Sequence, residues 1–498
     1  MKKAIYIFSF LLIAGMGCTD LTEDLYDKIP ADLYPENDLQ LATLAVPGYA
    51  AFRPLVDDEG WWYLAQEITS DELCAPTRDA DWDDGGKWRV MHEHTWSNDV
   101  EGVNNMWGRL YEATTTCNIK SDFLKALPPS DDILKKIAEL DVLRSMYYYL
   151  LIDNFGDVPY LSTTIDVPEK PYRNHREAIW DSLVSTLESS LPKLQNVDKK
   201  YLATRSLAYS LLAKLYLNAE VYTGTPQWEK AGNYCDSVIN TGFYTLDPDP
   251  QGPFVTNNET NSEIIFSIPY DENEFKGFRI HMRSLHYQSN LTFDMPVGPW
   301  NGFAALESHY NSYEDGDLRK EKFFLAGAQK DSKGAVILDA VAAVPLFFSP
   351  VIPALRMDAT FTTAQIRMSG VRPFKYVVKK GSIENLSNDF VVFRITDIYL
   401  MKAEAEIRLK GAGAGDEWID PIRERAEVSK QAGADLDFLL AERGRELFME
   451  GHRRQDLIRF GEFGKAWWEK LPSDASRETF PIPKWASDAN ENLLSDSQ

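Results

Sequence analysis

The sequence predicts a mostly α-helical protein that forms a single body, with a loop-rich face and little β-structure. In several separate segments, apolar residues recur at spacings of three and four, which is the pattern of one face of an amphipathic helix. Long turn-rich segments separate these helices. Hydrophobic residues make up 44% and charged residues 26% of the 498 residues. This balance is typical of a folded globular protein and excludes a disordered chain or a multi-span membrane bundle.

Residues 1–17 have the pattern of an export signal and are expected to lie outside the fold. Lys2 and Lys3 are followed by an apolar run from Ala4 to Ala14, and small residues precede Cys18. The run is far shorter than the roughly 20 residues that cross a bilayer as a helix. Because the signal ends directly before a cysteine, the segment resembles a bacterial lipoprotein signal and predicts lipidation of Cys18. A plain secretory signal with an incidental cysteine is the alternative.

The charge balance and the cysteines exclude several classes of function. Acidic residues outnumber basic ones by 76 to 52, and a net charge of −24 repels phosphate backbones, so nucleic acid is not an expected partner. Beyond Cys18 there is no CxxC pair, so we expect neither a disulfide framework nor a thiolate metal site. The remaining thiols are expected to be small buried hydrophobic side chains, at Cys74, Cys117 and Cys235.

Helices are predicted along most of the chain. Segment 143–154 pairs with 176–191, segment 206–220 (SLAYSLLAKLYLNAE) carries a wide apolar face and is followed by 228–239, and 396–410 repeats the pattern. Their small alanine side chains permit close packing. The pairs therefore resemble degenerate tetratricopeptide units that are interrupted by insertions.

Two stretches depart from the helical pattern. Segment 263–268 (EIIFSI) is β-like, and we expect 329–370 to be a loop excursion.

Several segments occur in an order that is found in one known family. They are LRSMYYYLLIDNFGDVPY (143–160), LLAKLYLNAEVYTGTPQWEKAGNYCDSVI (211–239), FRITDIYLMKAEAEIRLKG (393–411), ERGRELFMEGHRRQDLIRFGEF (442–463) and PIP (481–483). Together they resemble the SusD/RagB family of Bacteroidetes outer-membrane nutrient-binding lipoproteins. The resemblance spans the chain from signal to C-terminus. It loosens only at 490–498 (NENLLSDSQ).

The resemblance implies an organisation and a function. It implies a signal at 1–17 and an N-terminal region at 18–240 with tetratricopeptide-like helices. A C-terminal region at 241–498 would form one body with that region. It further implies a lipid-anchored protein of the outer membrane, facing the cell exterior, that captures oligosaccharide. Such a protein would cap a SusC-like TonB-dependent barrel for import, with no catalysis and no cofactor. An acidic tract after Cys18 resembles the surface-export tract of such lipoproteins, with Asp20, Glu23 and Asp24.

Loop tryptophans are the main candidates for ligand contact. Sugars present C–H faces and rings of hydroxyls, so a glycan site needs aromatic plates with polar side chains at their edges. Trp82 lies in RDADWDDGGKW, which follows a TSDE segment (69–72) at the place of the family's binding loop. We expect Trp82 and Trp88, with Arg78 and Asp81, to contact the ligand. Burial is the alternative, and it is favoured for Trp96 and Trp107.

A second candidate loop contains Trp300, Asn301 and Phe303, in DMPVGPWNGFAALESHY. It matches a family segment that supplies an aromatic plate and a polar contact. The alternative is a turn with a core aromatic residue, because Asn-Gly is common in turns for steric reasons alone.

Other acidic and histidine clusters are weaker candidates. His92 and His94 lack a third ligand at metal spacing. The DADWDDGG segment resembles a calcium loop, but it lacks the required glycine and closing glutamate. Glutamates recur every fourth residue among arginines, which favours a salt-bridged helix over paired catalytic carboxylates, at Glu442, Glu446 and Glu450. No metal site is therefore predicted.

Two rival functions belong to other classes. A secreted helical glycoside hydrolase would also be acidic and tryptophan-rich, and would need two carboxylates roughly 5 to 10 Å apart. A protein-docking module built on the helical repeats is the third possibility, although loop aromatics favour a small ligand. The sequence does not name the glycan or distinguish it from a peptide.

Overall fold

The computed structural model describes residues 35, 37–57 and 59–495, so Cys18 and the predicted signal lie outside the described residues. The chain divides into two compact units, residues 1–44 and residues 45–498. The first contributes one described helix, α2 (Asp38–Thr43). In the second, helices predominate, and the described strands form five two-stranded sheets. The predicted mostly α-helical class is confirmed. Within the described ranges, no helix has the length and apolar character needed to cross a bilayer.

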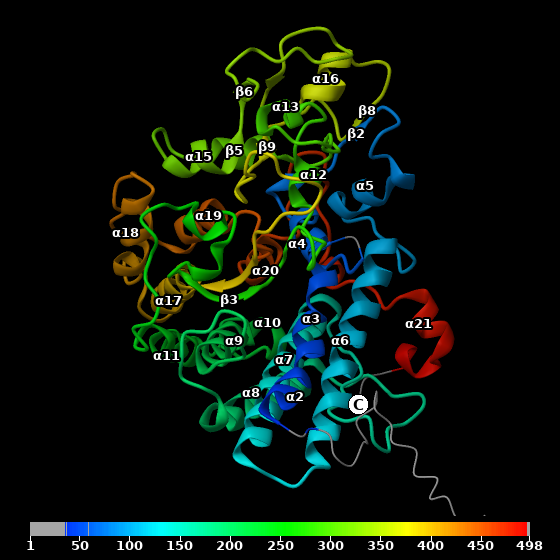
Figure 1. The fold of residues 1–498 in the computed structure, drawn as a ribbon, viewed down its shortest axis with the longest axis vertical. Helices are drawn as coiled ribbons and strands as arrows, with labels where there is room; N and C mark the ends of the chain where they lie inside the picture. Colours follow the sequence, from blue (N-terminus) through cyan, green and yellow to red (C-terminus); the bar gives the residue numbers. More distant parts are fainter. Residues whose placement is uncertain (1–34, 36, 58, 496–498) are drawn as a thin grey trace, which may run out of the picture. The chain divides into compact units, whose positions relative to one another are not determined.

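Three long helices form one side of the second unit. α6 (Glu101–Lys125) and α7 (Asp131–Phe155) lie side by side, and α8 (Arg176–Ser190) packs against α7 (Figure 1). The start of α7 is fixed by Ser130, whose hydroxyl oxygen accepts a backbone N–H of the first turn. The helix stops at Gly156, which has a positive φ of 71° that suits a residue without a Cβ.

Two helix predictions need correction in their bounds. Segment 143–154 is only the second half of α7, whose first half also carries apolar residues at helical spacing, at Ile133, Ile137 and Leu140. The single helix predicted at 206–220 is divided into α9 (Arg205–Leu217) and α10 (Ala219–Thr223). Asn218 leaves the helical region at this break, and its side chain donates to the carbonyl four residues earlier at 2.8 Å. This competition with backbone hydrogen bonds is typical of asparagine.

A second group of helices packs around α17 (Ile395–Lys410), which was predicted at 396–410. It contacts α9 and α11 (Trp228–Ile239), as well as α18 (Asp416–Arg425) and α19 (Leu436–Leu447). α20 (Arg453–Arg459) follows α19 and packs against it. Apolar side chains of α17, α18 and α19 form one buried cluster, which includes Leu400, Ile407, Ile419, Ile422 and Leu439.

Ion pairs fill the interior next to this cluster. Glu442, Glu446 and Glu450 are all buried. Arg319 donates to Glu442 at 2.7 Å and to Glu446 at 3.0 Å, while Arg394 donates to Glu450 at 2.7 Å. Because α19 ends before Glu450, the three carboxylates do not share one helical face as the spacing suggested. Buried carboxylates of this kind require paired cations, which agrees with a structural role.

A buried helix near the start of the second unit packs against the C-terminal part of the chain. The Tyr63 hydroxyl of α4 (Trp62–Ile68) donates to the Met449 carbonyl at 3.3 Å. The backbone N–H of Gly451 donates to Glu67 at 2.7 Å, across 384 residues of sequence. Burial raises the pKa of Glu67 to about 8. Residues from near the start and near the end of the second unit therefore share one core.

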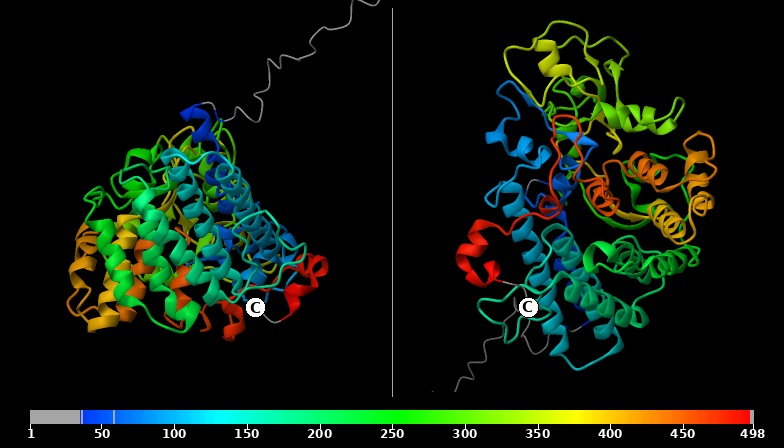
Figure 2. Two further views of the ribbon diagram at one scale, coloured as in Figure 1. Left: turned by 90° about the horizontal axis from the view of Figure 1, so that it is seen from below. Right: turned by 180° about the vertical axis from the view of Figure 1, so that it is seen from behind.

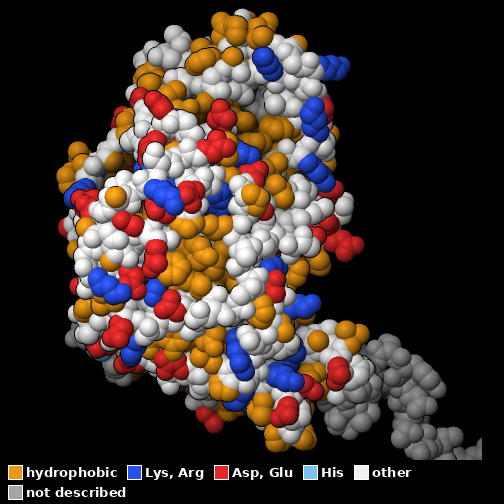
Figure 3. Space-filling model, turned by 90° about the vertical axis from the view of Figure 1, so that its left-hand side faces the viewer, with side chains coloured by type: hydrophobic (Ala, Val, Ile, Leu, Met, Phe, Trp, Pro, Cys, Tyr) orange, Lys and Arg blue, Asp and Glu red, His pale blue; other side chains and the backbone are white. Residues whose placement is uncertain are grey.

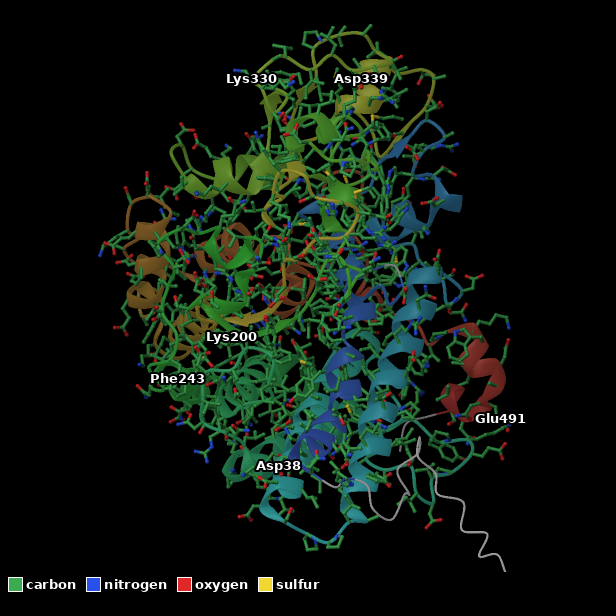
Figure 4. The ribbon with its side chains drawn as sticks, viewed as in Figure 1. Asp38, Lys200, Phe243, Lys330, Asp339 and Glu491 are labelled. Carbon is green, nitrogen blue, oxygen red and sulfur yellow. The ribbon has the colours of Figure 1, made fainter. Side chains whose placement is uncertain are left out.

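Strands are short and lie mostly near the loop-rich end. The β-like segment at 263–268 forms β3 (Ile264–Ile268), which pairs antiparallel with β10 (Phe390–Arg394) in the register Phe390 to Ile268. The predicted loop excursion at 329–370 is more ordered than expected. It contains β7 (Phe347–Phe348), β8 (Arg356–Met357) and α16 (Thr363–Met368). Thr362 and Gln365 form a capping box at the start of α16. Lys330 and Asp339 mark this segment in Figure 4.

The C-terminal helix lies beside α6 when the second unit is seen from the front and from behind (Figure 2). α21 (Lys484–Ala489) is held there by its first backbone N–H, which donates to the Asn98 carbonyl at 2.8 Å. On the face shown in Figure 3, acidic and basic side chains are interspersed with apolar ones. The negative net charge is therefore not gathered into a single patch on that face.

Candidate functional site

The two predicted loops meet at one surface pocket of about 380 Å³. We call it the aromatic pocket, and its lining includes Asp81, Trp82, Asp84, Trp88, Tyr287 and Trp300. Four of the seven predicted ligand-binding residues lie on its surface, namely Asp81, Trp82, Trp88 and Trp300. The other three are buried behind the loops, namely Arg78, Asn301 and Phe303.

A tight turn presents the first loop. β2 (Thr77–Arg78) pairs in parallel with β8, and the Arg78 N–H donates to the Asp81 carbonyl at 2.8 Å. The Arg78 guanidinium donates inward, to the backbone carbonyls of Ile366 at 2.7 Å and Ser369 at 3.0 Å. In this structure, Arg78 therefore anchors the turn to residues 366–369 and is not at the pocket surface, where ligand contact was predicted.

Trp82 is the residue through which the two loops touch. Its indole N–H donates to the Trp300 carbonyl at 2.7 Å. Its ring centroid lies 5.3 Å from that of Trp88 and 5.6 Å from that of Phe303, both in tilted contacts. A Cβ at Gly302 would lie 2.2 Å from the Trp82 ring, so only glycine permits this approach. Trp82 is 8% exposed and Phe303 is 0% exposed, so Phe303 supports the plate from behind.

Trp88 extends this aromatic cluster into the core. Its ring stacks on Trp61 with centroids 4.7 Å apart, and its N–H donates to the Asp84 carboxylate at 2.7 Å. The remaining tryptophans of this region are buried, namely Trp61, Trp62, Trp96 and Trp107. Burial of Trp96 and Trp107 agrees with the expectation for these two residues.

Trp300 is half-buried and is more accessible than the other three predicted aromatic residues, Trp82, Trp88 and Phe303, which are all buried. The Arg283 guanidinium carbon lies 5.4 Å from its ring centroid, and that of Arg279 lies at 5.8 Å. Both arginines bind the Asp57 carboxylate. These contacts hold the ring by cation–π attraction while part of it faces solvent.

Asn301 adopts a positive φ of 60°, a region that asparagine enters more readily than most other residues. Its Nδ2 donates to the Arg367 carbonyl at 3.0 Å, and its Oδ1 accepts from Arg372 at 2.8 Å. The amide is fully committed within the protein. Asn301 therefore fixes the orientation of Trp300 in place of the predicted polar contact with a ligand.

Exposed carboxylates form the polar rim of the aromatic pocket. Asp81 accepts a hydrogen bond from the Tyr287 hydroxyl, and Asp84 accepts from Trp88. Burial and the bond to Asp81 raise the pKa of Tyr287 to about 12, so its hydroxyl remains a donor at neutral pH. Each carboxylate has a second oxygen, and an ionised carboxylate only accepts. The rim can therefore receive hydroxyl groups.

Tyr287, Asp84 and Arg283 were not predicted. Arg283 and Tyr287 both precede the second loop. Arg283 lies on the short helix α12 (Ile280–Ser284), and Tyr287 follows three residues after its end. Their only signal in the sequence is an aromatic and a basic residue within HMRSLHYQSN, a stretch without strong periodicity.

The histidine and aspartate clusters do not form a metal site. No group of three potential metal ligands occurs among the described residues. Burial lowers the pKa of His92 to about 4, and one of its ring nitrogens lies 2.8 Å from the Trp468 carbonyl. In the acidic loop, Asp83 pairs with Arg89 at 2.7 Å. The three described cysteines are free and buried, as expected.

Two family models match this chain. One is described as "SusD family" and covers residues 357–493, and the other is described as "Starch-binding associating with outer membrane" and covers residues 65–217. The chain belongs to the SusD/RagB family. Both family segments contribute to the aromatic pocket or its supports, through Trp82 and Trp88 in one and Arg367 and Arg372 in the other.

Curated and solved SusD/RagB proteins resemble the chain over most of its length. Starch-binding protein SusD of Bacteroides thetaiotaomicron is 25% identical, over 98% of this chain and 97% of that protein. SusD-like protein P25 of Formosa agariphila is 24% identical, over 72% of this chain and 70% of that protein. Surface glycan-binding protein A from Bacteroides thetaiotaomicron, in complex with laminarihexaose, has a TM-score of 0.72 at 19% identity and covers 91% of this chain and 97% of its own. At this identity the likeness shows the shared fold.

Proposed function

We propose that this SusD/RagB protein binds oligosaccharide in the aromatic pocket and releases it unchanged. The observation that carries the proposal is the pairing of a half-exposed Trp300 ring with exposed Asp81 and Asp84 at one rim. An aromatic face matches the C–H face of a sugar, and carboxylates accept hydrogen bonds from its hydroxyls. Relatives named for binding starch, laminarin and laminarihexaose support this ligand class.

Hydrolysis is the rival that the pocket must be weighed against. A glycosidase needs one carboxyl group that keeps its proton, which burial in an apolar site achieves. Asp81 and Asp84 are both exposed, and each already accepts a hydrogen bond from a neighbouring side chain. Both are thereby suited to accepting hydrogen bonds, so binding without turnover is the function that the rim supports best.

The cellular setting is also a proposal. We infer that Cys18 carries lipid, that the protein faces the exterior at the outer membrane, and that it caps a SusC-like TonB-dependent barrel for import. In the same proposal, regions 18–240 and 241–498 form one body. The family membership and the phrase "associating with outer membrane" in one family description support this setting.

A binding experiment with a matched control tests the proposed function. Size-graded malto- and laminari-oligosaccharides are titrated into wild type, Trp300→Ala and Trp485→Ala, because Trp485 is 52% exposed on α21 and does not line the aromatic pocket. Wild type and Trp485→Ala should bind one series. Trp300→Ala should bind that series with an affinity at least about tenfold lower. Prolonged incubation should release no new reducing ends. Absence of binding by wild type, or turnover that one Asp or Glu substitution abolishes, would contradict the proposal.

A further inference from the structure

A second surface pocket, of about 340 Å³, is lined in part by Arg279, one of the two arginines that lie against the Trp300 ring. We call it the second pocket, and its lining includes Arg53, Asp57, Lys276, Arg279, Glu384 and Asn385. None of these residues belongs to the loops that the sequence analysis selected. The second pocket is therefore a separate feature of the molecule that needs its own account.

The two pockets share one wall. Asp57 accepts from Arg279 at 2.7 Å, and Arg279 lines the second pocket. The same carboxylate binds Arg283, which lines the aromatic pocket. Both guanidinium groups lie against the Trp300 ring. A ligand chain that covers Trp300 thus has Arg283 on the side of one pocket and Arg279 on the side of the other.

The second pocket repeats the kinds of group that suit a sugar unit. Phe275 directly precedes the lining residue Lys276 and is 45% exposed, and the guanidinium carbon of Arg53, which also lines the pocket, lies 4.3 Å from its ring centroid. The Asn385 Oδ1 accepts from the Gly277 N–H at 2.9 Å, while its Nδ2 has no hydrogen-bond partner among the described residues. The half-exposed Glu384 carboxylate lies at 3.6 Å from Arg279, which is longer than a direct hydrogen bond. A free amide donor and an available acceptor therefore line this space, and an exposed aromatic ring packs against one of its lining residues.

We propose that the second pocket is a further subsite for the same glycan chain. The chain would run from the aromatic pocket across Trp300 to Phe275, so that the site holds an oligosaccharide of several units. This inference rests on the proposed function, because it needs a glycan in the aromatic pocket. The second contact is made by a ligand that has already lost its translational freedom, so its contact energy adds directly to affinity. Affinity should then rise with chain length.

A chain-length series with distal variants tests this subsite. Di-, tetra- and hexasaccharides of the malto and laminari series are titrated into wild type and Phe275→Ala/Asn385→Ala. Wild type should bind the hexasaccharide at least tenfold more tightly than the disaccharide, and the double variant should lose that gain while binding the disaccharide as wild type does. Phe347→Ala, which removes a 51% exposed phenylalanine outside both pockets, is the matched control and should behave as wild type.

The outcomes separate the two proposals. If wild type binds neither series at any length, the proposed function fails, and the subsite fails with it. If wild type binds a series but affinity does not depend on length, or the double variant keeps the length dependence, the subsite is overturned while the proposed function stands. Thermal melting of the double variant should match wild type, because Phe275 and Asn385 are not part of the core. A large loss of stability would instead assign both side chains to packing.

Discussion

The Trp82 indole N–H donates to the Trp300 carbonyl at 2.7 Å, and this contact joins two loops that are 218 residues apart in sequence. It holds the Trp82 ring, which also packs against Trp88 and Phe303. A binding plate with so many restraints loses little freedom when a ligand arrives. Preorganisation of this kind increases affinity without adding contacts.

Truncation of the two joined tryptophans should have different effects. Trp300→Ala removes a half-exposed plate, so glycan affinity should fall by about 1 to 3 kcal/mol with a small change in melting temperature. Trp82→Ala removes a ring that is 8% exposed, so it should also cost about 3 to 5 kcal/mol of stability. Isothermal titration and chemical denaturation of both variants check this. Equal stability losses would show that Trp300 is as much a core residue as Trp82.

Gly302→Ala should disturb the pocket from within the loop. The new Cβ would lie 2.2 Å from the Trp82 ring, so the ring must move, at a cost of about 1 to 3 kcal/mol in unfolding free energy and with weaker glycan binding. Tryptophan fluorescence and denaturation report both changes. Gly108→Ala on α6 is the control, because its nearest contact would be 3.9 Å away and the helix favours alanine. A neutral Gly302→Ala variant would rule out the tight approach.

Acid should weaken the buried ion-pair network through Glu442. Burial alone would raise its pKa, but Arg319 and Arg445 outweigh burial and lower the pKa from 4.5 to about 2. A carboxyl with a depressed folded pKa adds stability that is present above pH 4.5 and is lost as the pH falls toward 2. The free energy of unfolding, measured across this window, should therefore decrease.

The Glu442→Gln variant isolates this residue. It should lose about 3 to 5 kcal/mol at neutral pH, because the surrounding arginines keep their buried charge, and its pH dependence should be shallower. Glu491→Gln, at an exposed position labelled in Figure 4, should change stability by less than about 0.5 kcal/mol. If Glu442→Gln keeps the wild-type slope, the acid sensitivity arises from other carboxylates.

Cys18→Ala should release the protein from the membrane fraction. The predicted anchor depends on a lipid carried by this thiol, and the three described cysteines are buried and cannot replace it. Cell fractionation with a labelled fatty acid measures both attachment and release. Membrane retention of the variant, without a labelled band for wild type, would contradict lipid anchoring.

A barrel partner should be recovered with the protein from native membranes. Extraction in several mild detergents, followed by affinity purification, should yield a complex with a large TonB-dependent β-barrel protein. Recovery of the lipoprotein alone in every detergent would contradict the proposed partnership.

Local pattern explains which features the sequence predicted. The helices at 228–239 and 396–410 follow from spacings within each segment, so they appear almost as expected. Trp82 and Trp300 were selected because loops often carry recognition, and the structure places both on the lining of the aromatic pocket. The break at Asn218 escaped notice because the apolar pattern continues across it.

Long-range pairing explains what the sequence could not predict. Arg78, Asn301 and Phe303 lie in the same segments as the residues that line the aromatic pocket, but the partners that bury them come from elsewhere in the chain, up to 291 residues away for Arg78, so no local pattern separates support from surface. Tyr287 and the wall formed by Asp57 were missed for the same reason. Tyr287 reaches the pocket only when segment 283–287 meets the loops at 81–88 and 299–300, and Asp57 forms the wall only when it meets Arg279 and Arg283.

The contacts between α4 and the residues that follow α19 also set the order of folding. Glu67 meets Gly451 only after another 384 residues have been synthesised, so α4 lacks its C-terminal contacts for most of the chain's emergence, although α6 is available to it much earlier. Closure of such a long loop is slow, and contacts of high sequence separation delay folding. A fragment that ends before Met449 should leave a buried face and the Glu67 carboxyl without cover, and we expect it to aggregate instead of forming a smaller domain. The protein therefore completes its fold after synthesis, when its last helices are available.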